Sequence, residues 1–369
     1  MSASMGRVFA DTGLAAERPW WQAGTTFSLA DRLDSYIRRE IAAQPDLLRR
    51  TDIGLRGIVL PAVVRGADRL LVVAAGSALR AATAARGWIE QISGLPCDVA
   101  PPGDASPPGG TAVVLVARPG QAAGMPAAVA DWRARGIATV ALVDAPEVSR
   151  ACGADLCWPI EAGTERGAAA TKSFTVQLLA LLRLGVALGA ARGTLDADAM
   201  QRAERALGDA PLAAALAEAA EARLATLGAR IARAGEAVVI GHGWGAALAG
   251  EAALMLSQFA GIRADAVSGG RAGLEKLRAG VPVLLLAGAD QTLAETVACA
   301  EDAGRHGGQV IVLAEAACST SFGKFAGEVV ALPGRGPAQM FAQAVATQLV
   351  ACHTALALGL DVDQPRSQA

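Results

Sequence analysis

The sequence is poor in aromatic residues and in net charge. Its 369 residues include only six Trp, one Tyr and seven Phe, and 33 Lys and Arg nearly balance 35 Asp and Glu. The net charge of -2 gives no electrostatic reason to expect a nucleic-acid or anionic-membrane partner. Because 53% of the residues are apolar, the chain can bury a large core of mainly Ala, Val and Leu, which excludes disorder over most of its length.

Every long apolar stretch of the chain is interrupted by polar residues. The two longest of these stretches are Val176–Ala191 and Ala344–Leu360. The first contains Arg183 and the second contains Gln348 and His353, so both predict buried helices and no membrane partner. The N-terminal segment has no basic stretch followed by an apolar core and a cleavage site, which makes the cytoplasm the expected location.

The cysteines form no CxxC pair, and a cytosolic chain of this size needs no disulfides. A metal site would need more ligands at closer spacing, so we expect no metal and no cofactor. The six cysteines are interpreted as small apolar packing residues: Cys97, Cys152, Cys157, Cys299, Cys318 and Cys352.

From Arg69 onward, short apolar runs alternate with longer helical patterns, which is typical of βαβ units and a parallel sheet. The fold class is therefore α/β with two similar halves. Strands are predicted in the first half at Arg69–Ala75, Ala112–Ala117, Ile137–Val143 and Leu156–Ile160, and in the second at Ala237–Gly241, Val281–Ala287, Val310–Ala314 and Val329–Leu332.

Helical patterns complete this organisation. A long apolar helix is predicted in each half, at Thr171–Leu188 and Pro337–Leu358, and an amphipathic one at Ser28–Asp52 with Ser28 as its N-cap. The predicted divisions are an N-terminal segment and helix (1–50), a first domain (51–193), a helical connector (194–228), a second domain (229–360) and a C-terminal tail (361–369).

The two halves are related in sequence. A shift of 167 positions without a gap aligns Gly76 with Gly243 and Gly94 with Gly261, which indicates duplication of one fold. In each copy a strand ends in a Gly-containing turn and a helix begins. The helix N-terminal N–H groups then face the carboxyl edge of the sheet, where open α/β folds bind ligands.

Four segments together resemble the tandem sugar-isomerase (SIS) domain proteins, in particular the isomerase half of glucosamine-6-phosphate synthase. YIRREIAAQPDLLRRT (36–51) is similar to the family's "EI..QP..LR" helix and GWIEQISGLPCDV (87–99) to its "WIE.ISG.P..V" segment. GTERGAAATKSFTVQLLALL (163–182) resembles "E.GVASTKAFT.QL", and DVDQPR (361–366) resembles "D.DQPR". The resemblance covers nearly the whole chain from about Asp34.

The resemblance implies two flavodoxin-like SIS domains, a homodimer and a sugar-phosphate or amino-sugar-phosphate ligand. No initiating Cys follows Met1, so we do not expect the synthase's glutaminase domain or ammonia release from glutamine. The sequence ends at Ala369, just before the position of the family's terminal Lys.

The phosphate-binding loops depart from the family pattern. The family's Ser-Gln-Ser-Gly loop is replaced by Ala117–Ala122, where Pro119 removes a backbone donor. Arg118 either restores charge toward a phosphate or faces solvent, and Gly120 and Gln121 are the other candidate ligand contacts in this loop.

Two other segments keep part of the pattern. Gly76 and Ser77 stand where the family has Gly-Thr-Ser, and Ser77 either contacts an anion or only caps its helix. Thr171 is interpreted as a cap or ligand contact. Lys172 either contacts a ligand or holds a carbonyl terminus or a carboxylate of the protein, because a first-turn Lys opposes the helix dipole and needs a reason to be there.

The proton-transfer groups of the synthase are mostly absent. The family's "EGALKLKE" helix corresponds to residues 251–258, where Glu251 is kept, Met255 replaces a Lys and Gln258 replaces the proposed base. An amide cannot act as a base near neutral pH, so Gln258 is expected to contact substrate only. The family's ring-opening "GELKHGP" loop corresponds to Gly270–Leu274, which has no His.

Only three histidines are present in the chain. His242 lies in the Gly turn of the second half, at the expected sheet edge, and is with Glu251 a candidate catalytic group. His306 is interpreted as a helix C-terminal residue and His353 as a packed core residue.

The sequence leads to two alternative functions. The first is an enzyme that isomerises a sugar phosphate or deaminates an amino-sugar phosphate with rearranged chemistry. The second is a catalytically degenerate phosphosugar-binding or regulatory relative. Family resemblance favours the first and the site residues favour the second, so whether the chain is an enzyme stays open.

Overall fold

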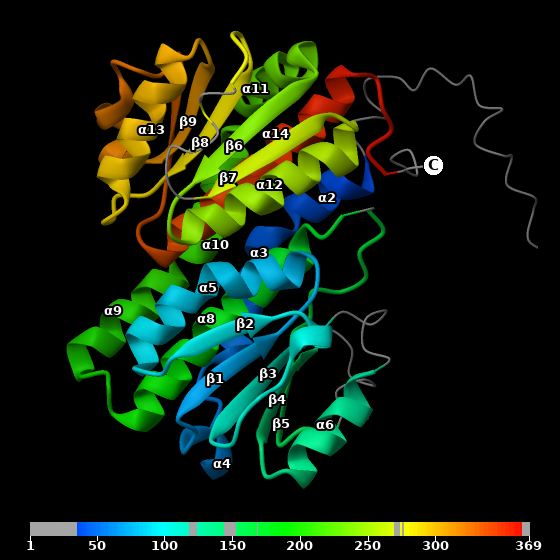
Figure 1. Ribbon diagram of the computed structural model, residues 1–369, viewed down its shortest axis with the longest axis vertical. Coiled ribbons are helices and arrows are strands. Elements are labelled where there is room, and N and C mark those ends of the chain that lie inside the picture. Colours follow the sequence, from blue (N-terminus) through cyan, green and yellow to red (C-terminus); the bar gives the residue numbers. More distant parts are fainter. Residues whose placement is uncertain are drawn as a thin grey trace, which may run out of the picture.

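The computed structural model describes residues 35–117, 124–143, 153–167, 169–268, 274 and 277–363. Within them the chain forms two five-stranded sheets with helices between and outside them (Figure 1). The predicted N-cap Ser28 lies outside the described residues.

The first sheet has the order β2-β1-β3-β4-β5, and all its neighbouring strands are parallel. β1 and β3 are apolar because helices cover both faces of the sheet. The strands are β1 Arg69–Val73, β2 Cys97–Ala100, β3 Thr111–Ala117, β4 Ala138–Val143 and β5 Leu156–Pro159.

The second sheet repeats this topology as β7-β6-β8-β9-β10, again parallel throughout. This 2-1-3-4-5 order is that of flavodoxin-like folds and confirms the predicted fold class. The strands are β6 Glu236–Gly241, β7 Arg263–Ser268, β8 Pro282–Ala287, β9 Gln309–Glu315 and β10 Glu328–Leu332. The shared order is what a duplication predicts, although the duplication itself stays a prediction.

A layer of helices separates the two sheets. α5 packs on α8 and α12, and α12 packs in turn on α14. α6 covers the outer face of the first sheet and α13 that of the second (Figure 1). Their bounds are α5 Ser77–Ser93, α6 Met125–Ala134, α8 Lys172–Arg192, α12 Trp244–Ala260, α13 Leu293–Arg305 and α14 Pro337–Ala357.

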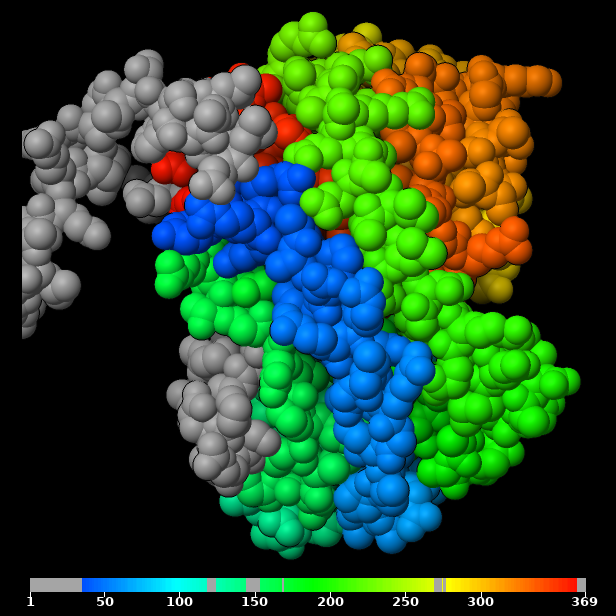
Figure 2. All heavy atoms as spheres, turned by 180° about the vertical axis from the view of Figure 1, so that it is seen from behind, coloured from blue at the N-terminus to red at the C-terminus, as the bar shows by residue number. Residues whose placement is uncertain are grey.

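Shorter elements connect and cover this layer. The expected connector forms three helices, α9 Ala197–Gly208, α10 Ala210–Ala219 and α11 Glu221–Ala234. Figure 2 shows α2 and α3, in blue, lying across the boundary between the halves. The others are α2 Tyr36–Ala42, α3 Gln44–Leu55, α4 Ala62–Arg65, and the 3-10 turns Pro102–Asp104 and Ala316–Phe322.

The amphipathic stretch was predicted as one continuous helix, and this prediction was wrong. The amphipathic stretch divides at Ala43 into α2 and α3, because Pro45 lies in the first turn of α3 and cannot continue the hydrogen bonding of a longer helix. Within the described part, α2 is capped by Ser35, whose Oγ accepts from Arg38 N at 3.1 Å.

α8 and α14 are each long and apolar enough to cross a membrane by length and composition. In both, 83% of the apolar window is buried inside the protein. They are packed as core helices, as the sequence predicts.

Candidate functional site at the boundary between the halves

Two glycine turns place helix N-termini at corresponding positions of the two sheets. Gly76 (φ 58°, ψ -133°) precedes α5 and Gly243 (φ 55°, ψ -127°) precedes α12. Residues with a Cβ rarely adopt this backbone conformation, so the turns need glycine. They let each central strand pass directly into a helix whose first N–H groups face the sheet edge.

Glu251 of α12 reaches across the boundary to the first half. The Ser77 hydroxyl interacts with its carboxylate, and its Oε2 lies 3.8 Å from Arg80 Nε. Only 4% of Glu251 is exposed, and within the described residues its Oε2 has no hydrogen-bond partner. The site therefore contains one buried carboxyl group whose Oε2 lies near a guanidinium but accepts no hydrogen bond from the described residues.

Burial raises the pKa of Glu251 to about 7, because the charged form loses its hydration. The Ser77 hydroxyl and the charge of Arg80 lower this pKa, and the charge of Glu165 raises it further. A carboxyl group that titrates near neutral pH can both take up and release a proton there, which general acid–base catalysis requires.

Glu165 closes the N-terminus of α8. Its Oε1 accepts hydrogen bonds from Thr171 N at 2.8 Å and Ser173 N at 3.0 Å, and its Oε2 accepts from Ser173 Oγ at 2.6 Å. Carboxylates at helix N-termini satisfy backbone donors that otherwise have no partner. A substrate anion that reached this helix end would compete with Glu165.

Thr171 and Lys172 are accordingly engaged with the protein itself. Thr171 is fully buried, and its hydroxyl also lies 3.4 Å from Glu165 Oε1. Lys172 Nζ donates to the carbonyl of Thr164 at 2.8 Å, which accounts for a cation in the first turn of α8. Their roles as ligand contacts stay predictions.

His242 lies on the other side of the second sheet from Glu251. It is 4% exposed, and its Nδ1 is 3.1 Å from Thr296 Oγ1. Its Nε2 is 3.6 Å from both Glu295 Oε1 and Cys299 Sγ. All three partners belong to α13, so the structure does not bring the two predicted catalytic residues together.

The remaining predicted contacts are spread out. Gln258 is exposed near the C-terminal end of α12, two turns beyond Glu251, and Met255 is buried in the core. Gly76 is exposed beside Ser77. Arg118, Gly120 and Gln121 lie outside the described residues.

Sequence reasoning missed the roles of Arg80 and Glu165. Arg80 stands in the first turn of α5, where a cation opposes the helix dipole. The same argument drew attention to Lys172 and could have identified Arg80. Glu165 is the Glu of the family segment "E.GVASTKAFT.QL", but the motif gives it no role, because its contact with α8 depends on the path of the loop before the helix.

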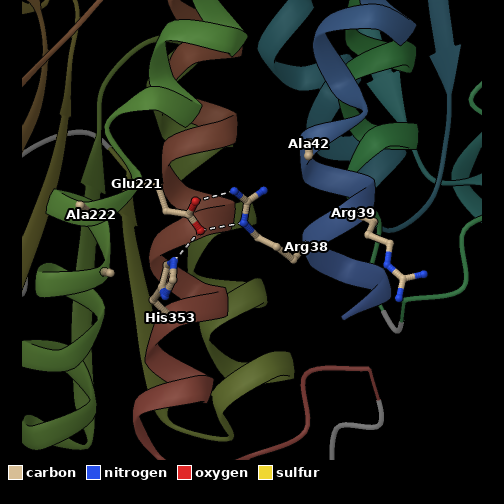
Figure 3. A pocket seen from close by; sticks show the side chains of 7 residues that line it. Arg38, Arg39, Ala42, Glu221, Ala222 and His353 are labelled. Carbon is tan, nitrogen blue, oxygen red and sulfur yellow. Dashed lines mark hydrogen bonds and ion pairs between the residues drawn. The ribbon is translucent and has the colours of Figure 1, made fainter. Parts of the chain in front are cut away.

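A separate pocket of about 540 Å³ lies between α2, α11 and α14 (Figure 3). Arg38 Nε donates to Glu221 Oε1 at 2.7 Å, and His353 Nε2 is 2.8 Å from the same oxygen. The interpretation of His353 as a core residue was wrong: its side chain is 12% exposed and bonded to Glu221, because α14 reaches the surface near its C-terminal end. His306, by contrast, caps the end of α13 as predicted.

Other chemical groups add no second site. Among the described residues, no three or more His, Cys, Asp or Glu side chains are grouped so that they could hold a metal ion. The described cysteines are free thiols, and burial raises the pKa of Cys97 and of Cys352 to about 12. Those two thiols are therefore uncharged at neutral pH.

Two parallel sheets of the same strand order, with helix starts paired at their edges, define a doubly wound α/β protein with tandem halves. Residues 64–187 match the SIS domain family. The resemblance to SIS-domain proteins found in the sequence is therefore confirmed for this segment.

Curated relatives agree with this assignment. The chain is 30% identical to glutamine–fructose-6-phosphate aminotransferase (isomerizing) of Caulobacter vibrioides, and 28% identical to one from Bradyrhizobium diazoefficiens. Each comparison covers 98% of this chain but only 63% of the relative. The chain thus spans less than two thirds of the length of these relatives.

Solved structures show the same fold. The C-terminal domain of glucosamine-fructose-6-phosphate aminotransferase from Francisella tularensis matches with a TM-score of 0.83 at 21% identity, covering 90% of this chain and 98% of that one. Tagatose-6-phosphate ketose/aldose isomerase from Escherichia coli matches with a TM-score of 0.71 at 18% identity, covering 94% and 100%. Glucosamine-6-phosphate deaminase from Thermotoga maritima matches with a TM-score of 0.65 at 18% identity, covering 90% and 98%.

Proposed function

We propose that this protein binds a phosphorylated sugar at the boundary between its halves and that Glu251 transfers a proton on it. The reaction class is aldose–ketose isomerisation or deamination of an amino-sugar phosphate. The observation that carries the proposal is Glu251 itself, which is buried beside Ser77 and Arg80, accepts no hydrogen bond at Oε2 from the described residues and has a pKa of about 7.

The names of the similar proteins support the substrate class. They include a tagatose-6-phosphate isomerase, a glucosamine-6-phosphate deaminase and fructose-6-phosphate aminotransferases. All of these names refer to a phosphorylated sugar. Isomerisation and deamination both need a group that moves a proton between adjacent carbons, which a carboxylate can do.

Synthase-type chemistry has less support. The family's base position is held by Gln258, an exposed amide that cannot take up a proton near neutral pH, and Met255 is buried where the family has a Lys. These two observations favour a second candidate function, a phosphosugar-binding or regulatory protein without turnover.

Solvent-proton exchange separates the two candidates. The protein would be incubated in D2O with fructose 6-phosphate or glucosamine 6-phosphate, and deuterium incorporation at C1 and C2 followed by NMR. We expect exchange with the unaltered protein and a loss of about 10²–10⁴-fold in Glu251→Gln, since this is the usual contribution of a general base. Glu301→Gln, an exposed change on α13, is the control.

Calorimetry with the same sugar phosphates gives the binding result. Binding without exchange would establish the second candidate. No heat and no thermal shift with any hexose 6-phosphate or amino-sugar phosphate would remove the phosphosugar assignment altogether. Exchange that survives Glu251→Gln would show that another group is the base.

Two further expectations complete the proposal. A homodimer is expected from the family resemblance, and light scattering would show about twice the chain mass of 37.2 kDa. A monomer would contradict it. The cytoplasmic location stays a prediction from the sequence.

A further inference from the structure

The position of Arg80 is electrostatically unfavourable unless an anion lies beside its guanidinium. It is the fourth residue of α5, where the partial positive charge of the helix N-terminus repels a cation. Its side chain, 34% exposed, points across the boundary between the halves and brings Nε to 3.8 Å from Glu251 Oε2. The anion that offsets the helix dipole is therefore supplied by the other half.

Gly250 makes this approach possible. A Cβ at position 250 would lie 3.2 Å from Arg80 Nε, which is tighter than most Cβ contacts, and 3.7 Å from its Cδ, which is ordinary van der Waals contact. The residue before Glu251 therefore has no side chain at the place where the Arg80 side chain passes over α12. Arg80, Gly250 and Glu251 form one packed unit.

The groups around Glu251 come from three elements. Ser77 and Arg80 approach from α5, Glu165 approaches from the segment before α8, and Glu251 itself is on α12. Glu165 acts against the charged form of Glu251, whereas Arg80 favours it. Without Arg80, a carboxylate that is already buried would face a second carboxylate with only a hydroxyl to stabilise it.

We propose that Arg80 is a positioning residue that holds the Glu251 carboxylate at the boundary between the halves and favours its charged form. The consequence for turnover rests on the proposed function, because only a charged Glu251 can take a proton from the sugar. The contact between Arg80 and Glu251 does not depend on any substrate, so the inference can be tested without one.

The direct test is the titration of Glu251 in protein carrying ¹³C-labelled glutamate, followed by NMR, with Glu251→Gln used to assign its resonance. In Arg80→Gln we expect the midpoint to rise by about one pH unit, since an opposite charge within 4–6 Å lowers a carboxyl pKa by roughly 1–3 units. Arg80→Lys keeps the charge and is expected to restore most of the shift. Arg86→Gln, also on α5 but paired with Glu90, is the matched control and should change nothing.

A variant that leaves Arg80 in place tests the packing. Gly250→Val should displace the guanidinium and raise the Glu251 midpoint in the same direction as Arg80→Gln. An unchanged midpoint in a folded Arg80→Gln protein would overturn the inference, and so would failure of Arg80→Lys to restore it.

The experiments distinguish failure of the role proposed for Arg80 from failure of the proposed function. If sugar phosphates undergo exchange, the pH profile of Arg80→Gln should move to higher pH by the same amount as the titration. If they do not, a shifted titration still supports the role of Arg80 while the proposed function fails.

Discussion

At Glu251, the charged form that the proposed catalysis needs is also the form that destabilises the folded protein. Its pKa is about 7 in the folded protein, against an ordinary value of 4.5. Folding therefore favours its protonated form. Below about pH 4.5 both folded and unfolded states are protonated and the carboxyl group costs nothing, whereas above about pH 7 the folded state carries the full cost of a buried charge.

Glu251→Gln should accordingly stabilise the protein, and only at higher pH. We expect the free energy of unfolding to be nearly unchanged at pH 4 and to rise by on the order of 1–3 kcal/mol at pH 8, since one pKa unit corresponds to about 1.4 kcal/mol. Urea denaturation across this range measures it. A constant difference at all pH values would show that the carboxyl group does not titrate near neutrality.

His242 should behave as a structural residue. Its ring is buried against Thr296, Glu295 and Cys299 of α13, so His242→Ala removes contacts between the turn and this helix and leaves a cavity. We expect a loss of about 2–4 kcal/mol in the free energy of unfolding, with sugar-phosphate exchange retained. Loss of exchange in a variant that stays folded would instead support the sequence-based prediction that His242 is catalytic.

At the scale of elements, α3, α8 and α9 are joined by an ion-pair network whose central pair, Arg183 and Asp52, is buried and whose outer members, Arg56 and Glu204, are partly exposed. Arg183 of α8 is 3% exposed, and its Nε donates to Asp52 Oδ1 at 2.6 Å. Its Nη1 donates to Glu204 Oε2 of α9 at 2.6 Å, and Arg56 Nη2 donates to Asp52 Oδ2 at 2.6 Å. Each charge has a partner, which is the condition for burying it.

Removing one charge from this network should lower the free energy of unfolding. Asp52→Asn leaves the guanidinium of Arg183 buried with less compensation, and we expect a loss of about 3–5 kcal/mol in the free energy of unfolding. Asp46→Asn provides the matched control, because Asp46 pairs with Arg49 on the exposed side of the same helix and should change stability by less than about 1 kcal/mol. Equal effects of the two substitutions would contradict the assignment of a buried central pair.

The central strands could be predicted from the sequence because helices cover both faces and their apolar runs are continuous. β3 and β4, whose residues are all buried, were found within one residue of their ends. The edge strand β7, RADAVS, was not predicted, because an edge strand exposed to solvent needs no apolar run. β2 was indicated only by the family resemblance.

The candidate site was less predictable for a related reason. Ser77 and Glu251 could be selected from motifs, but their interaction depends on how α5 meets α12 across the boundary. The contact of Arg80 with Glu251 depends on the same packing and on the missing side chain at Gly250. Contacts between segments about 170 positions apart leave no periodic pattern in one sequence.

At the scale of the whole molecule, the two halves share one core. A single cluster of buried residues runs from Ile37 of α2 through the layer of helices between the sheets to Val362. Buried hydrogen bonds cross it as well: Gln348 of α14 accepts from Gln44 at 2.6 Å and donates to the Thr171 carbonyl at 3.2 Å. Neither half can expose its inner helices without exposing those of the other.

This shared core leads us to expect one cooperative unfolding transition despite the two sheets. Differential scanning calorimetry should give a calorimetric enthalpy equal to the van't Hoff enthalpy, since separate domains would unfold in steps. Gln348→Leu is the informative variant, because it removes the hydrogen bonds of Gln348 with Gln44 and with the Thr171 carbonyl and leaves Gln44 only its bonds with Ile41 and Thr175. We expect it to lower the free energy of unfolding by about 1–3 kcal/mol while the transition stays single. Two resolved transitions in the unaltered protein would show that the central helices form an interface between independent domains and not a common core.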